Sequence, residues 1–487
     1  MKYHDSITKA IVFFACVALT TSFALAAPKD ITSQRNPFPD GTPNPNGSLN
    51  VEARYLVHVG FTAVTAGLTS AVNVNSRGLL EYHSSGGNSG NWGRLNNSIV
   101  AIGTAGGQEN FTPNTFGGPN PDYAGYLFNL PATVTAIKFW NRTNTDGGTF
   151  AATPEVQYLD APDPIGTWHT ISGVTWSPAY NPDYLPGNEV RLYNITLNEP
   201  ISGAWGIRLI GDGNPNGGVA TDPTGWVGFQ ELVIIGELDI GDIDLSKNKA
   251  LSSLPSSPIA IATREQGANE MVRLNDGNIT TRSQTWGDFP EYAEDYMGIA
   301  WGTPQYGVSA MGIAFHSFGD GGLFDDCQVP LRIEYTTSTN PDWTPVTNLN
   351  KHRYPYVWQR ISYLANVQVG FLFTFDPVND VTAIRIIGDP HGDAGADESG
   401  FLGAYEVEVF GVPVLAEVID SDDDGDIDEI DVAAFTTCAS GDQVPYVVPD
   451  CADRDLDGDG DVDQKDFALV QLCYTGGGTH WDPNCGN

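Results

Sequence analysis

Positive charge is scarce in this chain. It has 23 Lys and Arg against 60 Asp and Glu in 487 residues, which gives a formal net charge of -37 at pH 7. Proteins bind phosphate backbones mainly through Lys and Arg, so this composition argues against nucleic acid as a partner. After residue 26 there is no run of about 18 apolar residues, the length that a membrane-spanning helix needs. We therefore expect no membrane span in the mature protein.

Catalytic motifs are missing as well. The sequence has no G-x-S-x-G elbow, no H-E-x-x-H and no P-loop, and its 8 His residues are scattered. Acidic pairs are abundant, but spacing alone does not separate a glycosidase pair from metal-binding or surface carboxylates. We predict that the protein is not an enzyme. A divergent glycan-active enzyme with an unrecognised site is the alternative.

The N-terminus has the features of a secretory signal peptide. Two lysines precede a mostly apolar stretch over 10–26, which ends in the small-x-small triplet Ala24-Leu25-Ala26. A membrane anchor is the rival interpretation, but the stretch is short and polar residues at 20–22 interrupt it. We predict a signal peptide over 1–26 and a secreted, extracellular or cell-surface protein.

The chain repeats itself over a period of about 175 residues, which is too long for a solenoid unit and indicates a duplicated domain. The segment GIRLIGD at 206–212 matches AIRIIGD at 383–389. Each is followed by a Gly-, Asp- and Pro-rich loop and a second matching segment that ends in Gly. Short β-branched and aromatic runs between turn residues predict two β-sandwiches, over 49–238 and 245–412. A linker rich in Pro, Asn and Gly is expected before them, over 27–48.

The LNDGN segment at 274–278, the GIRLIG and AIRIIG segments, and the final Glu-containing segments resemble the galactose-binding-like family of discoidin, or coagulation factor C-type, domains. The resemblance implies jelly-roll sandwiches whose loops at one end carry the ligand. Because aromatic faces and a few polar groups hold sugars, carbohydrate is the expected ligand. The candidate contacts are Trp140, Asn141, Arg142, Trp226, His316 and His391. Alternatively, these aromatics cap the core and the protein is structural or adhesive, without a sugar ligand.

The acidic run near the C-terminus resolves into two twelve-residue loops, 420–431 and 455–466. Both have acids at positions 1, 3, 5, 9 and 12, Gly at 6 and a β-branched apolar residue at 8. Calcium takes six to eight oxygen ligands, position 7 supplies a backbone carbonyl, and Gly permits the sharp turn. We predict two structural Ca²⁺ ions, and position 8 is expected to pair the two loops. The predicted calcium-binding residues are Asp420, Asp422, Asp424, Asp426, Asp428, Asp431, Asp455, Asp457, Asp459, Asp461, Asp463 and Asp466.

The arrangement around these loops is not that of an ordinary EF-hand. Residues 411–418 are β-branched and carry Pro413, which is poor helix material, and position 12 is Asp in both loops. Loop followed by helix, twice, resembles the dockerin module, here over 418–487. The resemblance implies docking to a cohesin or another extracellular protein through positions 10 and 11. Those positions often hold Ser-Thr in the family, but here they hold Glu429-Ile430 and Gln464-Lys465. This difference from the family puts cohesin docking in question and leaves the predicted calcium ligands unchanged.

Four of the 6 cysteines lie in this module and indicate disulfides in an oxidising compartment. Four cysteines allow three pairings. Because Cys438 and Cys473 follow their loops at the same distance, we favour the symmetric pairing of Cys438 with Cys451 and Cys473 with Cys485. The state of Cys327 is left open.

Overall fold

The structure is a computed structural model, and the predicted signal peptide lies outside the residues that it describes. It describes residues 29–33, 36–38, 44, 48, 50–56, 63–65, 72–74, 80–82, 110–111, 122–143, 148–162, 165–183, 189–214, 227–263, 271–278, 281–285, 294–317, 322–325, 330–352, 354, 367–391, 401–422, 424–479, 481–482 and 485. The chain forms two compact units. One is Ala27–Val414, and the other contains Leu415–Asn487. Among the described residues, no helix is long and apolar enough to cross a membrane.

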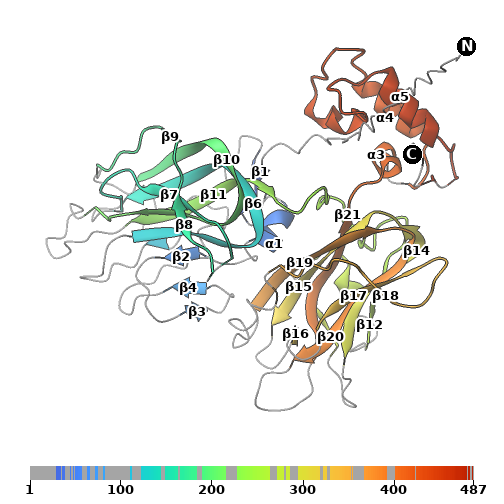
Figure 1. The fold of residues 1–487 in the computed structure, drawn as a ribbon, viewed down its shortest axis with the longest axis horizontal. Coiled ribbons are helices and arrows are strands. Elements are labelled where there is room, and N and C mark those ends of the chain that lie inside the picture. The colour runs from blue at the N-terminus through green and yellow to red at the C-terminus, as the bar shows by residue number, and fades with distance from the viewer. Residues whose placement is uncertain are drawn as a thin grey trace, which may run out of the picture. The chain divides into compact units, whose positions relative to one another are not determined.

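The larger unit is mainly β, as predicted, and antiparallel sheets build its two sandwiches (Figure 1). The first contains β1 (Lys29–Asp30), α1 (Val51–Leu56), β2 (Ala63–Thr65), β3 (Val72–Val74), β4 (Leu80–Tyr82), β5 (Asn110–Phe111), β6 (Asp122–Thr143), β7 (Glu155–Leu159), β8 (Trp168–Thr170), β9 (Val174–Ser177), β10 (Glu189–Gly211) and β11 (Gly228–Leu238). Nine of these strands form one sheet with the main order β1-β11-β6-β10-β7-β8. Strands β6 and β10 are long, and register shifts interrupt their pairing between Thr196 and Gly206. One half of β10 therefore pairs with β7 and the other half with β9, whereas β11 pairs with one half of β6 and β2 with the other.

The second sandwich repeats this plan with the long strands divided. It contains β12 (Ile259–Ala262), η2 (Met271–Leu274), β13 (Ser283–Gln284), β14 (Asp295–Gln305), β15 (Val308–Ser317), β16 (Leu323–Asp325), β17 (Arg332–Thr337), β18 (Thr344–Pro345), β19 (Val367–Val378), β20 (Val381–His391) and β21 (Gly403–Gly411). Its sheets have the orders β12-β14-β20-β17-β18 and β13-β21-β15-β19. By sequence match and pairing, β14 with β15 corresponds to β6, and β19 with β20 corresponds to β10.

The repeated segments lie in β10 and β20, where side chains alternate between the two faces of a sheet. Ile207 and Leu209 are fully buried in the first core, and Ile384 and Ile386 are fully buried in the second. Arg208 lies between the two inward residues of β10, so its side chain leaves on the outer face. The apolar alternation that identified the repeat is therefore the alternation that fills both cores.

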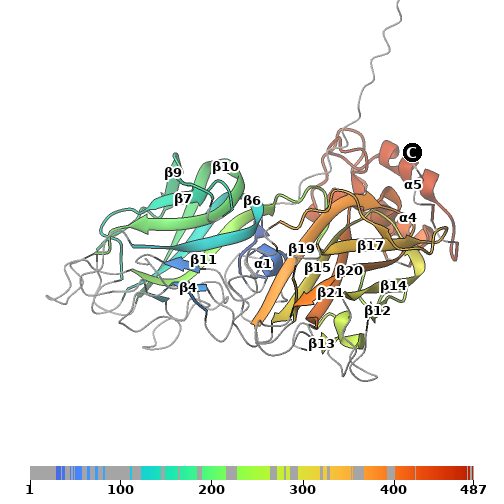
Figure 2. The same cartoon turned by 60° about the horizontal axis from the view of Figure 1, so that its bottom comes forward.

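The segment predicted as a linker over 27–48 begins with structure. Its β1 pairs with β11, and Ile31 is fully buried. Helix α1 then lies between β6 of the first sandwich and β19 of the second (Figures 1 and 2). Tyr55 packs edge-on against Phe410 of β21, with ring centroids 6.1 Å apart. This part of the chain therefore joins the two sandwiches, and composition alone did not predict that role.

The C-terminal unit contains α3 (Leu415–Ile419), α4 (Glu429–Cys438), η3 (Pro449–Arg454) and α5 (Gln464–Cys473). Phe435 of α4 lies against Phe467 of α5, with ring centroids 5.7 Å apart. The disulfides are Cys438–Cys451 and Cys473–Cys485, the symmetric pairing that was predicted. The expectation that no helix precedes the first loop was wrong: α3 starts two residues beyond Pro413 and therefore avoids its ring.

Candidate functional site

The two acidic loops of the C-terminal unit have the same local backbone. Gly425 and Gly460 at position 6 have φ values of 91° and 95°, which favour glycine. The position-1 carboxylates close both turns. Asp420 accepts hydrogen bonds from the N–H groups of Asp424 and Gly425, and Asp455 accepts them from Asp459 and Gly460. The sequence pattern thus produces two matching loops.

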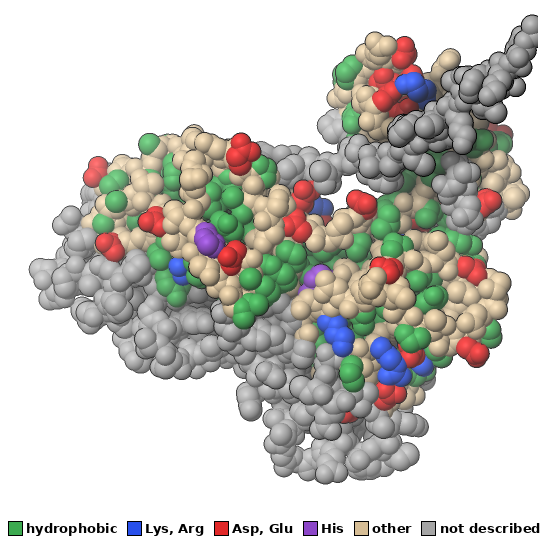
Figure 3. Space-filling view, viewed as in Figure 1, with side chains coloured by type: hydrophobic (Ala, Val, Ile, Leu, Met, Phe, Trp, Pro, Cys, Tyr) green, Lys and Arg blue, Asp and Glu red, His purple; other side chains and the backbone are tan. Residues whose placement is uncertain are grey.

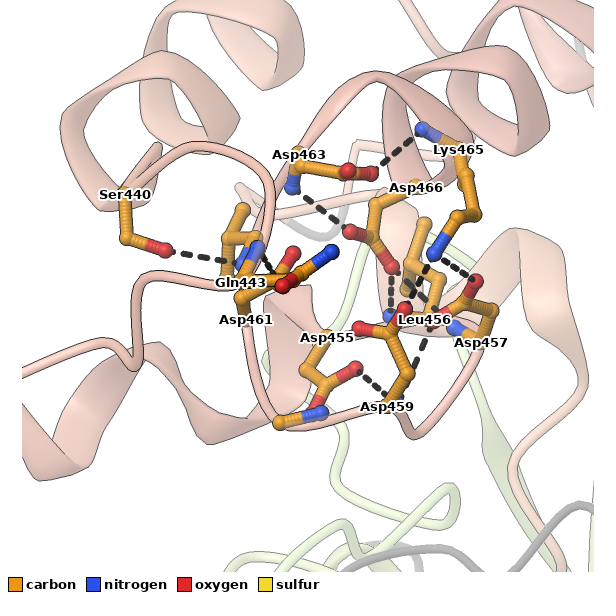
Figure 4. Close-up of polar contacts among 12 residues, drawn as sticks. Ser440, Gln443, Asp455, Leu456, Asp457, Asp459, Asp461, Asp463, Lys465 and Asp466 are labelled. Atoms are coloured by element: carbon orange, nitrogen blue, oxygen red, sulfur yellow. Dashed lines mark hydrogen bonds and ion pairs between the residues drawn. The ribbon is translucent and has the colours of Figure 1, made fainter.

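Three carboxylates meet in each loop, from positions 1, 3 and 12. Oxygens of Asp420, Asp422 and Asp431 lie within 4.8 Å of one another, and those of Asp455, Asp457 and Asp466 do the same (Figure 4). Burial and the neighbouring carboxylates raise the pKa of Asp422 and Asp457 above its usual range. Like charges held this close favour a divalent cation between them, because the ion replaces their repulsion with attraction.

The position-12 residues, Asp431 and Asp466, are buried and organise the loops. Asp466 accepts hydrogen bonds from the N–H groups of Leu456 and Asp457 at 2.7 and 3.1 Å. It also accepts one from Asp463, which caps α5, so a capping box joins the loop to its helix. Asp431 makes the same box with Asp428 at the start of α4. Each predicted loop-to-helix junction is therefore built around the position-12 carboxylate.

The other predicted calcium residues are placed differently. At position 5, Asp459 is ion-paired with Lys465, and the hydrogen bond from Lys465 lowers the pKa of Asp459 (Figure 4). At position 7, the carboxylates bond to the opposite half of the unit, Asp426 to the N–H of Gly478 and Asp461 to the N–H of Gln443. The position-9 residues, Asp428 and Asp463, cap the helices, and Asp424 is not in either group of three.

The predicted pairing of the two loops through position 8 was wrong. Ile427 accepts hydrogen bonds from the N–H groups of Thr475 and Gly476, which follow α5. Val462 accepts them from Ser440 and Gly441, which follow α4. Each loop is therefore tied to the segment that leaves the opposite helix, because that segment presents two adjacent N–H donors to the position-8 carbonyl.

Sequence reasoning missed Trp481. Its indole Nε1–H donates to Asp420 Oδ2 at 2.9 Å, and its backbone N–H donates to Gly425 O at 3.1 Å. The ring is 8% exposed. A single Trp in a short Gly-rich tail was the only available signal, and it did not indicate which loop the ring covers. Acidic side chains gather on the visible face of the C-terminal unit, with a basic side chain among them (Figure 3).

The predicted ligand residues of the sandwiches fall into two groups. Trp140 and Asn141 are buried on β6, and the Asn141 amide donates to the carbonyls of Gly148 and Gly228. This interior position does not match the predicted contact with a ligand, because the amide already holds two loops together. Trp226 lies outside the described residues, and so do the side chains of Arg142, His316 and His391.

The repeat places a stacked arginine on the outer face of each sandwich. The Arg208 guanidinium carbon lies 4.2 Å from the Trp168 ring centroid and 4.7 Å from that of Tyr123. Arg385 lies 4.1 Å from Trp343 and 4.9 Å from Tyr296. The Tyr, Trp and Arg of this stack all recur at about the period of the domain repeat, but sequence reasoning used only the segment that carries the Arg.

The acceptor beside each stacked arginine differs between the copies. Arg208 donates from Nε and Nη2 to the amide oxygen of Gln157, whereas Arg385 donates from the same atoms to the carboxylate of Glu334. Gly125 and Gly298 face the arginines from the neighbouring strand, where a Cβ would come within 3 Å of the arginine backbone. The stack is thus a duplicated feature with a neutral acceptor in the first copy and a charged one in the second.

No protein-family model and no curated protein match the chain. Among solved structures it is similar to chitosan-binding module 1 of a chitosanase/glucanase from Paenibacillus sp. IK-5, with 18% identity and a TM-score of 0.22, over 34% of this chain and 99% of that chain. It is also similar to a family 32 CBM from Clostridium perfringens in complex with galactose, with 19% identity and a TM-score of 0.22, over 32% and 95%. Allantoicase from Saccharomyces cerevisiae matches with 12% identity and a TM-score of 0.22, over 62% and 81%. At these TM-scores none of the three carries a functional argument.

Proposed function

We propose that this is a secreted, non-catalytic protein whose C-terminal module folds around two Ca²⁺ ions and attaches the β-sandwiches to another extracellular protein. The observation that carries the calcium proposal is the meeting of position-1, position-3 and position-12 carboxylates in both loops. Backbone carbonyls and water would complete each coordination shell. Calcium would act structurally, because a module this small has too little apolar core to fold without ions and disulfides.

Calcium titration of the full-length, chelator-treated protein tests this proposal. We expect two tight sites, and each should disappear separately in Asp420→Asn and Asp455→Asn. The variant Asp453→Asn is the matched control, since Asp453 is exposed on η3 and belongs to neither group of three. If the wild-type protein binds no calcium at micromolar concentrations, the proposal is wrong.

An apolar edge of the C-terminal module supports the docking part of the proposal. Ile430 at the start of α4 is 55% exposed, and Leu472 and Tyr474 at the end of α5 are 66% and 44% exposed. These two helix ends adjoin, because Thr475 bonds to Ile427. The matching edge carries Lys465 instead of Ile430. Exposed apolar residues grouped in this way are typical of interaction surfaces.

A panel of cohesin modules, the partner class that the resemblance implies, tests docking. Binding should require calcium and should weaken about tenfold or more in Ile430→Ser and Leu472→Ser, as expected for apolar side chains at the centre of an interface. Thr437, which occupies the position in α4 that matches Leu472 in α5, provides the control, so Thr437→Ser should leave affinity unchanged. If no cohesin binds, the partner class is wrong, whatever the calcium result.

Carbohydrate binding by the sandwiches is the second candidate function. The half-buried Trp168 and Trp343 support it, because aromatic rings beside polar groups are the usual means of holding sugars. A glycan array probed with the full chain tests it. Selective binding that is lost in Trp168→Ala or Trp343→Ala would place the sugar on the outer faces. Binding that survives both changes would favour the predicted end loops, and no binding would favour a structural or adhesive protein.

A further inference from the structure

Beyond the two loop sites, a third group of carboxylates lies where the second loop meets the segment after α4. Oxygens of Asp442, Asp461 and Asp463 lie within 4.8 Å of one another. None of the three belongs to the group formed by positions 1, 3 and 12 of the second loop. Groups of acidic side chains are common on protein surfaces. This group indicates a cation site only if its buried carboxylate has an oxygen without a hydrogen-bond partner.

Asp461 is that buried member. It is 4% exposed, and its Oδ1 atom has no hydrogen-bond partner. Its Oδ2 atom accepts the N–H of Gln443, which holds the carboxylate against the segment that carries Asp442 (Figure 4). An isolated β-bridge between Pro445 and Asp461 fixes the same approach. A buried anionic oxygen without a donor is costly, and a cation can remove that cost.

The nearby basic side chain is committed elsewhere. Lys465 Nζ is ion-paired with Asp459 and lies 3.9 Å from Asp457, both on the loop-site side. Asp463 uses Oδ1 to accept the Lys465 N–H at the helix cap, at 2.6 Å. Among the described residues, no salt bridge involves Asp442, Asp461 or Asp463. Three carboxylates thus meet around one buried oxygen without a protein counter-ion in contact.

We propose that Asp442, Asp461 and Asp463 bind a third hard divalent cation, with calcium as the expected ion, which links the second loop to the segment after α4. Three carboxylates supply oxygen ligands, and water would complete the shell on the exposed Asp442 side. The site is expected to be weaker than the loop sites, because it uses fewer protein ligands.

The internal repeat contains a comparison for this site. Asp426 and Asp428 occupy the matching positions in the first half, and Asp426 is also buried with an Oδ1 that has no partner. The residue that matches Asp442 is Gly477, whose Cβ position would be 3.1 Å from the Asp428 carboxylate. The first half groups Asp426 and Asp428 instead with Asp431, which already serves the first loop site. The independent third carboxylate is therefore present only in the second half.

Equilibrium dialysis of the full-length protein against radioactive calcium, at an ionic strength that screens diffuse binding, counts the ions. We expect three per wild-type chain and two in Asp442→Asn and in Asp442→Gly, which copies Gly477. Asp453→Asn should keep three. In parallel, hydrogen exchange at the Gln443 amide should slow further after the loop sites are saturated, in the wild type and not in Asp442→Asn.

Two ions in the wild type would overturn the third site and leave the loop sites standing. Three ions that persist in both Asp442 variants would also overturn it, because the extra ion would then lie elsewhere. Two tight sites retained in Asp442→Asn, with unchanged far-UV circular dichroism, would show that the variant folds. A wild type with fewer than two tight sites would instead contradict the calcium function itself.

Discussion

The guanidinium of Arg54 lies 2.5 Å from the Glu408 carboxylate, although 354 positions separate the two residues. Arg54 belongs to α1 and Glu408 to β21 of the second sandwich, and both side chains are almost completely buried. The Tyr55 hydroxyl also donates to Glu408, in space that Gly312 leaves by having no side chain. Burial alone would lower the pKa of Arg54, but the adjacent Glu408 raises it. The contact therefore joins the sandwiches through a desolvated ion pair.

Replacing Arg54 by Met should destabilise the sandwich unit. The change leaves the Glu408 carboxylate buried with its positive partner removed, and breaking one side of such a pair costs about 3–5 kcal/mol. Urea unfolding followed by near-UV circular dichroism would measure the loss. Adding Glu408→Leu to Arg54→Met should recover a large part of it, since no unpaired charge is then left. Lys29→Met is the control, because the Lys29 side chain is half exposed in its pair with Glu52 and should change stability little. Equal losses of stability in Arg54→Met and Lys29→Met would contradict this account.

Glu406 should make the same unit less stable as pH rises. Burial, helped by Glu408 and Asp276, raises the pKa of Glu406 from 4.5 to about 8. Because the folded state holds the proton more tightly, the contribution of Glu406 is complete below pH 4.5 and declines up to about pH 8. Glu406→Gln keeps a neutral side chain at every pH, so it should remove this decline. We expect the decline in the free energy of unfolding to be on the order of 2 kcal/mol, because the structure relaxes around the ionised carboxylate. Urea unfolding of both proteins at pH 5.5 and 8.5 would test this. Parallel pH profiles would contradict it.

Sequence periodicity predicted the two sandwiches because their strands bury alternate residues, as Ile207 and Leu209 show. It also predicted the two twelve-residue acidic loops, since position 1, position 6 and position 12 act within twelve residues of one another. The Arg54–Glu408 contact was not predictable in this way, because nothing in the short segment VEARYL at 51–56 indicates a partner 354 positions away.

The pairing of position 8 failed for a related reason. Matching loops suggested that Ile427 and Val462 would meet each other. The structure instead pairs each with the segment after the opposite helix, where two consecutive N–H groups are available. Asp426 and Asp461, whose side chains hold these segments, occupy position 7, where the backbone carbonyl is the predicted calcium ligand. Local spacing identifies a loop but does not determine which other segment its side chains contact.

Calcium removal should affect one unit and not the other. We expect EDTA to abolish hydrogen-exchange protection in α4 and α5, because six carboxylates in the two groups then repel one another without an ion. Protection in β14 and β20 should be unchanged, since the described acidic groups that could hold a metal all lie in the C-terminal unit. Exchange measured by mass spectrometry on the full chain would resolve both regions. Retained protection of α4 and α5 in EDTA would contradict the structural role of calcium.

Asp466→Asn should weaken the second loop site more than Asp463→Asn. Both remove one negative charge, but only Asp466 lies in the group of three and also holds the N–H groups of Leu456, Asp457 and Asp463. An amide keeps the size of the side chain, so the loss reports on charge and acceptor number. We expect at least a tenfold fall in calcium affinity for Asp466→Asn, measured by calorimetry, because ligand charge count tunes these sites. Equal effects of the two changes would place both carboxylates on the same ion.

Removing the Cys473–Cys485 disulfide should weaken the first loop site, although both cysteines follow the second loop. The segment that this bridge closes includes Thr475, Gly476, Gly478 and Trp481, all of which bond to the first loop. A closed loop of this size stabilises by about 3 kcal/mol, so Cys473→Ser with Cys485→Ser should raise the calcium concentration needed to order the first loop. Terbium emission excited through tryptophan measures this site selectively, because the Trp481 indole bonds to Asp420.

The reciprocal change, Cys438→Ser with Cys451→Ser, should weaken the second site through Ser440 and Gln443 and leave the Trp481 signal nearly unchanged. If each double variant weakened only the loop that precedes its cysteines, the contacts between each loop and the segment after the opposite helix would not affect calcium binding.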